Sequence, residues 1–185
     1  MRHLYFRSFA LFFACTALVC ELTSCASAPG NPTEKAAAET GAAKVGEIDF
    51  SKNSSAISSD AKNKILEIVA ASKSKGEIKS VVVAAWSDQE YPAKDSPLPA
   101  EQVDLARDRA QNVISYLKLT LTLPGVSGLN MALRPTLVED RIPTPEAKIK
   151  DTFETYGSPP TILGDTKSPA IKGKASKVLI MVYLK

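Results

Sequence analysis

An apolar run near the middle of the chain constrains the fold more than any other feature. Residues 78–85 read Ile-Lys-Ser-Val-Val-Val-Ala-Ala, so Val81, Val82 and Val83 put apolar side chains on both faces of an extended strand. A strand of this kind lies in the interior of a sheet that is covered on both sides. Asp88 follows just past its C-terminal end, where ligands commonly sit in α/β sheets. The sequence therefore predicts a layered domain with a polar residue at one edge.

Strand and helix patterns alternate on either side of this run. Further strands are predicted over 45–50, 129–133 and 177–184, and the last is apolar on both faces. Helices are predicted over 60–74, 101–119 and 145–156, where apolar residues recur every three or four positions. The resulting order, β-α-β-α-β-α-β, predicts an α+β fold, an α/β sandwich in which helices cover a small mixed sheet.

The placement of reactive residues excludes several classes of active site. All three cysteines, Cys15, Cys20 and Cys25, and the single histidine, His3, lie within the first 25 residues. The body of the chain therefore lacks the groups for Cys or His catalysis, a Ser-His-Asp triad or a usual zinc site. No convincing pair of carboxylates replaces them, so neither an enzyme nor a cofactor is predicted. The net charge of +3, with both signs interspersed, does not indicate nucleic-acid binding.

The first 25 residues have the pattern of a secretory signal. Arg2 and Arg7 supply positive charge, and residues 8–20 form an apolar run that is too short to span a bilayer well. The run ends in Leu-Thr-Ser-Cys at 22–25, which resembles a bacterial lipobox. That resemblance implies cleavage before Cys25 and lipidation of this cysteine, with acyl chains such as palmitate. The alternative is an ordinary signal peptide with an incidental cysteine.

Several acyl chains on Cys25 would give stable membrane anchoring where one chain does not. Among lipoproteins an Asp after the cysteine indicates retention at the inner membrane, so Ala26 implies the outer membrane. Residues 26–44 are rich in Ala, Pro, Gly, Thr and Glu and have no large apolar side chain, which predicts a flexible tether. Its taut length would be about 65–70 Å. The predicted division is signal peptide 1–24, lipidated cysteine and tether 25–44, and folded domain 45–185.

The strand at 78–85 and the next helix carry the motifs of a known family. The strand ends in Ala85-Trp86-Ser87-Asp88, and the helix contains Leu105-Ala106-Arg107-Asp108-Arg109-Ala110-Gln111-Asn112-Val113. This resembles the OmpA-like, or peptidoglycan-associated lipoprotein-like, C-terminal domain. In that family a strand ends Gly-His-Thr/Ser/Ala-Asp, and a helix carries Leu-Ser-x-x-Arg-Ala-x-x-Val. Here Ala85 replaces the motif glycine and Trp86 the motif histidine. The closing Ser176-Lys177-Val178 stands where the family has Arg-Arg-Val.

The resemblance implies noncovalent binding of peptidoglycan from the periplasm, through the diaminopimelate of its stem peptide. This residue presents an ammonium and a carboxylate on one carbon. Asp88 would bind the ammonium, and Arg109 would bind the carboxylate bidentately. Backbone N–H groups of Leu105 and Ala106 are expected to donate to the same carboxylate. The alternative for Asp88 and Arg109 is a structural salt bridge that closes the loop onto the helix.

Five further residues complete the predicted binding site: Phe50, Asn53, Trp86, Ser87 and Gln102. Trp86 either forms an apolar wall for the stem peptide or packs as a core indole. Gln102 either hydrogen-bonds the ligand or is a solvated residue on the helix face.

A second function from a different class fits the same fold. The departures at Ala85 and Trp86 allow an OmpA-like scaffold that no longer binds peptidoglycan. Such a scaffold would instead bind another envelope protein, through the Pro-rich segment 89–100 or the long segment 157–174. The partners predicted are therefore peptidoglycan, the membrane through Cys25, or a further envelope protein.

Overall fold

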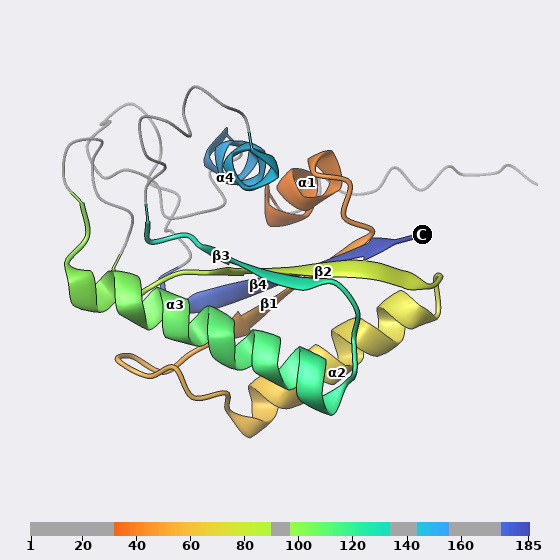
Figure 1. Ribbon diagram of the computed structural model, residues 1–185, viewed down its shortest axis with the longest axis horizontal. Coiled ribbons are helices and arrows are strands. Elements are labelled where there is room, and N and C mark those ends of the chain that lie inside the picture. Colours follow the sequence, from red (N-terminus) through yellow and green to blue (C-terminus); the bar gives the residue numbers. More distant parts are fainter. Residues whose placement is uncertain (1–31, 90–96, 134–143, 156–174) are drawn as a thin grey trace, which may run out of the picture.

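The structure is a computed structural model that describes residues 32–89, 97–133, 144–155 and 175–185 (Figure 1). Four strands form one mixed sheet in the order β1-β4-β2-β3. They are β1 (Lys44–Asp49), β2 (Ile78–Ala85), β3 (Val126–Asn130) and β4 (Lys177–Leu184). β4 runs antiparallel to β1 and β2, whereas β3 runs parallel to β2. Helices alternate with these strands along the chain, which confirms the predicted α+β class.

The two central strands are β2 and β4, and both are buried on both faces. Val81 and Val83 of β2 are fully buried, as are residues 178–182 of β4. Because β2 has a hydrogen-bonded neighbour on each side, the prediction of an interior strand is confirmed. Asp88 therefore follows a strand that lies between β4 and β3, and it is close to the start of β4.

One face of the sheet is covered by α2 (Ser59–Lys73) and α3 (Ala100–Ser115), which lie below the sheet in Figure 1. The Ser58 hydroxyl caps α2 by accepting a hydrogen bond from the Ala61 N–H at 3.1 Å. Both helices bury aliphatic side chains in one core with the facing residues of the strands, including Ile48, Ile65, Val81, Val113 and Ile180. Ile68 packs directly over Gly46 of β1, where a Cβ atom would lie 2.1 Å from the Ile68 Cδ1. Glycine is therefore required for this close approach.

The other face is covered by α1 (Pro32–Glu39) and α4 (Pro145–Thr155), above the sheet in Figure 1. Here the core is smaller and contains Ala36, Ala37, Trp86, Leu129, Phe153, Leu179 and Met181. The Thr144 hydroxyl accepts a hydrogen bond from the Ala147 N–H at 3.1 Å and so caps α4.

The prediction of a flexible tether over 26–44 is wrong for its described part. Residues 32–39 form α1, and Ala36 and Ala37 are 0% and 1% exposed against the sheet. The run 34–39 is compatible with a transient helix, but its docking was not predicted because the segment has no large apolar residue. Two methyl groups suffice to pack a helix closely on a sheet. The folded domain therefore begins no later than Pro32.

The boundaries around β3 also differ from the prediction. The strand spans Val126–Asn130 and not 129–133, and α3 continues as a π-helical segment, η1 (Tyr116–Thr120). Gly128 lies within this strand. A Cβ atom there would lie 2.6 Å from the Ile114 Cδ1, so this glycine allows α3 to pack closely on β3. The turn itself is at Gly125, which has φ +56°.

Candidate functional site

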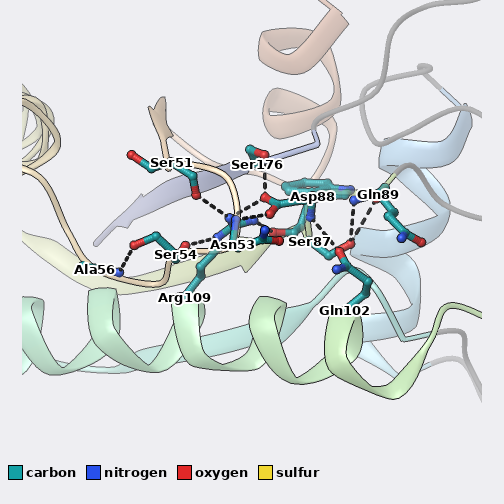
Figure 2. Close-up of polar contacts among 11 residues, drawn as sticks. Ser51, Asn53, Ser54, Ala56, Ser87, Asp88, Gln89, Gln102, Arg109 and Ser176 are labelled. Atoms are coloured by element: carbon teal, nitrogen blue, oxygen red, sulfur yellow. Dashed lines mark hydrogen bonds and ion pairs between the residues drawn. The ribbon is translucent and has the colours of Figure 1, made fainter.

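Asp88 and Arg109 meet at the C-terminal end of β2, as Figure 2 shows. Asp88 lies three residues past β2, and Arg109 projects from the face of α3 that packs on the sheet. An Nη2 hydrogen of Arg109 donates to the Asp88 Oδ1 at 2.5 Å. The two side chains are 0% and 4% exposed, respectively. The predicted pair therefore exists as a buried ion pair.

The guanidinium of Arg109 is held mainly by backbone carbonyl groups. Its Nε–H donates to Ser54 O at 2.9 Å, Nη1 donates to Trp86 O at 2.9 Å, and Nη2 donates to Ser51 O at 3.0 Å. Together with the bond to Asp88, these contacts engage four of the five N–H donors of a guanidinium. The charge is thus balanced by one carboxylate and three carbonyl dipoles, which is the pairing that a buried cation needs.

Phe50 completes the environment of the guanidinium. The Arg109 Cζ lies 5.3 Å from the centroid of the Phe50 ring, within the range of a cation–π contact. Phe50 itself is buried at the end of β1 and belongs to the core below the sheet. In this structure the predicted site residue Phe50 therefore contacts Arg109 from within the protein.

The carboxylate of Asp88 accepts hydrogen bonds on both oxygens. Oδ1 accepts from Arg109 and from the Ser176 hydroxyl at 2.6 Å, and Oδ2 accepts from the Asn53 N–H. The Asp88 N–H donates in turn to the Gln102 Oε1 at 3.1 Å. The contacts of Asn53 and Gln102 explain how both predicted residues reach the site: each orients Asp88.

The electrostatic balance at Asp88 favours the charged form. Burial raises the pKa of this carboxyl, but hydrogen bonds from Ser176, Asn53 and Arg109, with the charge of Arg109, outweigh burial. The pKa of Asp88 therefore lies below its ordinary value of 3.8. At neutral pH the site holds one fixed anion beside one fixed cation.

The turn 51–54 that contacts the pair is itself fixed at two points. Its Ser54 N–H donates to Ser51 O at 3.1 Å, and Asn53 adopts φ +56°, a left-handed conformation that asparagine tolerates well. The side-chain amide of Asn112 on α3 donates to Ser55 O at 2.8 Å. The pair and this amide therefore connect α3 to the chain that leaves β1.

Ser176 connects the site to the start of β4. It has φ +59°, its N–H donates to Ser87 O at 2.6 Å, and its hydroxyl donates to Asp88. Sequence reasoning missed the roles of Ser176, and of the Ser51 and Ser54 carbonyl groups. Ser176 stands at a motif position of the resembling family, but its residue type differs there. Contacts of backbone carbonyl groups cannot be predicted from residue types, because every residue has such a group.

Ser87 is buried and serves the local backbone. Its hydroxyl donates to Gln89 O at 3.1 Å and accepts from the Gln89 N–H at 3.3 Å, which fixes the chain on either side of Asp88. In these contacts Ser87 shapes the turn that carries the carboxylate.

Trp86 lies on the opposite side of the sheet from Arg109's helix. It is 1% exposed, and its ring meets Phe153 edge-on with centroids 6.4 Å apart at 71°. Among the described residues its Nε1 has no hydrogen-bond partner. The geometry favours the packing alternative for Trp86 over a wall for a ligand.

The expectation that Leu105 and Ala106 offer backbone N–H groups is wrong. α3 begins at Ala100, so both residues lie in its second turn, where the helical ladder uses their N–H groups. The sequence prediction placed the helix start at 101 and overlooked that only the first four N–H groups of a helix are unpaired. Gln102 and Val103 lie in that first turn, and their N–H groups contact Pro99 O.

Lys177, which takes the place of a motif arginine, pairs away from the site. Its ammonium contacts the Glu47 carboxylate at 2.5 Å and the Asp49 carboxylate at 2.7 Å across the β1–β4 ladder. Burial lowers the pKa of Lys177, but the hydrogen bonds that its ammonium donates to these acids raise the pKa above its ordinary value. The hydrogen bond from Lys177 is the main reason why the pKa of Asp49 is lowered.

Several predictions fall outside the described residues: Cys25 and the signal, most of the segment 89–100, and all of 157–174. Within the described ranges, no three His, Cys, Asp or Glu residues gather as a metal site would require. No helix among these residues has both the length and the apolarity needed to cross a membrane. The chain matches no protein-family model and no curated protein sequence.

Proposed function

We propose that this chain is a divergent OmpA-like lipoprotein of the outer membrane. Its periplasmic domain would bind peptidoglycan noncovalently, through diaminopimelate of the stem peptide, and so connect the membrane to the cell wall. The observation that carries the proposal is the ion pair of Asp88 and Arg109, joined at 2.5 Å at the end of β2. Both residues stand at the positions that the motif assigns to ligand binding.

The chain order supports the proposal. Four strands alternate with α2, α3 and α4, and the motif strand and motif helix lie side by side at the site. The OmpA-like relationship rests on this order and on the motifs around Asp88 and Arg109. The lipobox at Cys25 adds the anchor of a lipoprotein.

The internal partners of the pair have the same chemistry as the proposed ligand. The N–H of Asn53 and the hydroxyl of Ser176 donate to Asp88, as a ligand ammonium would. The carbonyl groups of Ser51 and Ser54 accept from Arg109, as a ligand carboxylate would. Binding would therefore exchange internal hydrogen bonds for ligand hydrogen bonds.

This exchange requires the turn 51–54 to move, because the Arg109 side chain is fully buried beneath it. Ser51 and Asn53 lie at the surface, so the turn can separate from the pair without crossing the core. Because each ligand hydrogen bond replaces an internal one, the net gain per bond is smaller than the roughly 1.5–3 kcal/mol that a charged hydrogen bond contributes, and micromolar affinity requires several such bonds. The expected affinity is therefore moderate.

The second candidate function is a scaffold that holds another envelope protein and leaves peptidoglycan unbound. The specific observation in its favour is the same burial: four of the five guanidinium donors already bond within the protein. In a scaffold of this kind, the ion pair would have a structural role and would hold α3, β2 and the turn after β1 together. The two functions predict opposite results in one experiment.

The experiment is a pull-down with purified sacculi, using the chain from residue 26 onward so that α1 is retained. Sacculi should retain the wild type, and Asp88→Asn and Arg109→Lys should each lose most of this retention. The matched control is the exposed pair Arg107 and Asp104 on the same helix, 2.5 Å apart. Asp104→Asn should bind as the wild type does, and circular dichroism at the assay temperature identifies any variant that has unfolded.

If folded Asp88→Asn and Arg109→Lys variants bind sacculi as well as the wild type, or if the wild type does not bind, the scaffold is the better account.

A further inference from the structure

Helix α1 is attached to the domain by smaller side chains than α2 is. It has eight residues, and its buried residues are Thr33, Ala36 and Ala37. α2, by comparison, buries Ile65, Ile68 and Val69. We propose that α1 is a detachable clasp, which shortens the membrane tether when docked and lengthens it when released. The change in reach rests on the proposed lipid anchor at Cys25, whereas the release of α1 from the sheet does not depend on it.

The docked position of α1 depends on close contact of small side chains. Ala36 and Ala37 pack into the cluster with Trp86, Phe153 and Met181, and α1 contacts β1 and α4. Glu34, Lys35 and Ala38 point outward and are exposed. Among the described residues, the part of α1 that is buried on the sheet thus consists of two methyl groups and a threonine, and further contacts lie at its C-terminal end.

Those terminal contacts form a well-defined helix end. The Gly41 N–H donates to Ala38 O at 2.9 Å, and the Ala42 N–H donates to Ala37 O at 3.0 Å, which is the Schellman arrangement. Gly41 has φ +86°, as this arrangement requires. The Thr40 hydroxyl also contacts the Tyr183 hydroxyl at 3.1 Å. The segment 40–43 is thus a short joint between α1 and the edge strand β1.

The physical reason for release is the small size of the docking interface. An eight-residue helix is not stable alone in water, so α1 is helical only while it is docked. Elements with few buried apolar groups open locally without global unfolding. β1 stays in place when α1 leaves, because β1 is paired with β4 along its whole length.

Release changes how far the domain can lie from its anchor. Six residues lie between Cys25 and Pro32, and the seven Cα–Cα steps span at most about 25 Å when taut. With α1 released the tether extends to Lys44, and its taut length rises to about 65 Å. A docked α1 therefore keeps the domain near the membrane, and a released α1 lets it reach a more distant layer of cell wall.

Hydrogen exchange of the full mature lipoprotein in phosphatidylethanolamine–phosphatidylglycerol vesicles tests the release. Amides of residues 36–43 should exchange at least about 100-fold faster than amides of β4 residues 178–182. Ala37→Glu, which places a charge in the docked face, should accelerate 36–43 by about tenfold or more and leave β4 unchanged. Ala38→Glu is the matched control on the exposed face and should behave as the wild type.

Equal protection of 36–43 and β4 in the wild type would overturn the clasp, and so would an Ala37→Glu variant in which β4 is accelerated equally. Energy transfer from a dye at Asn63→Cys, exposed on α2, to labelled lipid headgroups measures the reach. Ala37→Glu should lower this transfer relative to Ala38→Glu. Neither measurement uses peptidoglycan, so a failure of peptidoglycan binding would leave the clasp intact, and the reverse also holds.

Discussion

The two faces of the sheet are covered in different ways. Below the sheet, α2 and α3 bury long aliphatic side chains in a large core that continues to Phe50 and the buried guanidinium of Arg109. Above it, α1 contributes methyl groups, and the cluster centres on Trp86 and Phe153. The lower face therefore combines most of the described apolar burial with the buried ion pair of Asp88 and Arg109. The upper face is the side on which an element can detach at low cost.

The difference teaches how one pair of residues can be both structural and functional. Arg109 lies on the same helix face as Ala106, Ala110 and Val113, so its charge is part of the packed surface of α3. Its partners come from turns, which are the parts of a fold most able to rearrange. If a ligand replaced those partners, the packing of α3 on the lower face would still hold the Arg109 charge in a fixed position.

The largest expected effect is on the ion pair. Asp88→Ala removes the only carboxylate paired with Arg109 among the described residues and leaves a buried guanidinium with carbonyl partners alone. We expect the free energy of unfolding to fall by about 3–5 kcal/mol. Urea unfolding followed by the fluorescence of Trp86, the chain's single tryptophan, measures it.

A matched control for this prediction is Asp104→Ala, which removes an acid from the exposed pair with Arg107. Exposed pairs contribute about 0–1 kcal/mol, so this variant should unfold close to the wild type. Equal destabilisation by the two variants would show that burial of the Asp88 pair does not matter.

The next largest effect separates the two faces directly. Ile65→Ala empties a fully buried position below the sheet, and we expect a loss of about 2–5 kcal/mol. Ala36→Gly above the sheet removes one methyl group and weakens the helix, with a loss of about 1 kcal/mol. If Ala36→Gly proved as destabilising as Ile65→Ala in the same urea experiment, α1 would be an integral part of the core.

Acid should weaken the lower face through Asp88. Because its pKa is lowered in the folded state, the stabilisation is present above the ordinary value of 3.8 and is lost as the pH falls through the lower folded value. The difference in unfolding free energy between wild type and Asp88→Asn should therefore be constant from pH 7 to 5 and shrink below pH 4. A difference that grew in acid would reverse the assigned direction.

The smallest effect concerns the turn over the pair. Asn112→Ala removes the exposed hydrogen bond to Ser55 O. We expect the free energy of unfolding to fall by at most about 1.5 kcal/mol. Because the turn becomes easier to move, sacculus binding should increase. Gln111→Ala, an exposed neighbour on the same helix, is the control. Weaker binding by Asn112→Ala would mean that the turn helps to hold the ligand.

The sequence predicted the parts of the fold that depend on strong local patterns. The interior strand β2, the long helix α3 and the final strand β4 follow from periodic or continuous apolar residues, and the meeting of Asp88 with Arg109 was predicted from a motif. The docking of α1 was not predicted because it uses two alanines, and the position of β3 was misjudged because Gly128 serves helix packing. The carbonyl groups of Ser51 and Ser54 were not predictable, since residue type does not reveal backbone contacts.

The central claim is that the ion pair opens to bind the end of a diaminopimelate side chain. The most direct test is an NMR titration of the ¹⁵N-labelled chain from residue 26 with a stem tripeptide that ends in diaminopimelate. The account predicts saturable shifts of the Arg109 Nε–H and of the Asn53 and Asp88 amides. A tripeptide with lysine, which lacks the second carboxylate, should bind at least about tenfold more weakly. Unchanged Arg109 and Asn53 signals at millimolar tripeptide, or equal binding of the two tripeptides, would contradict it.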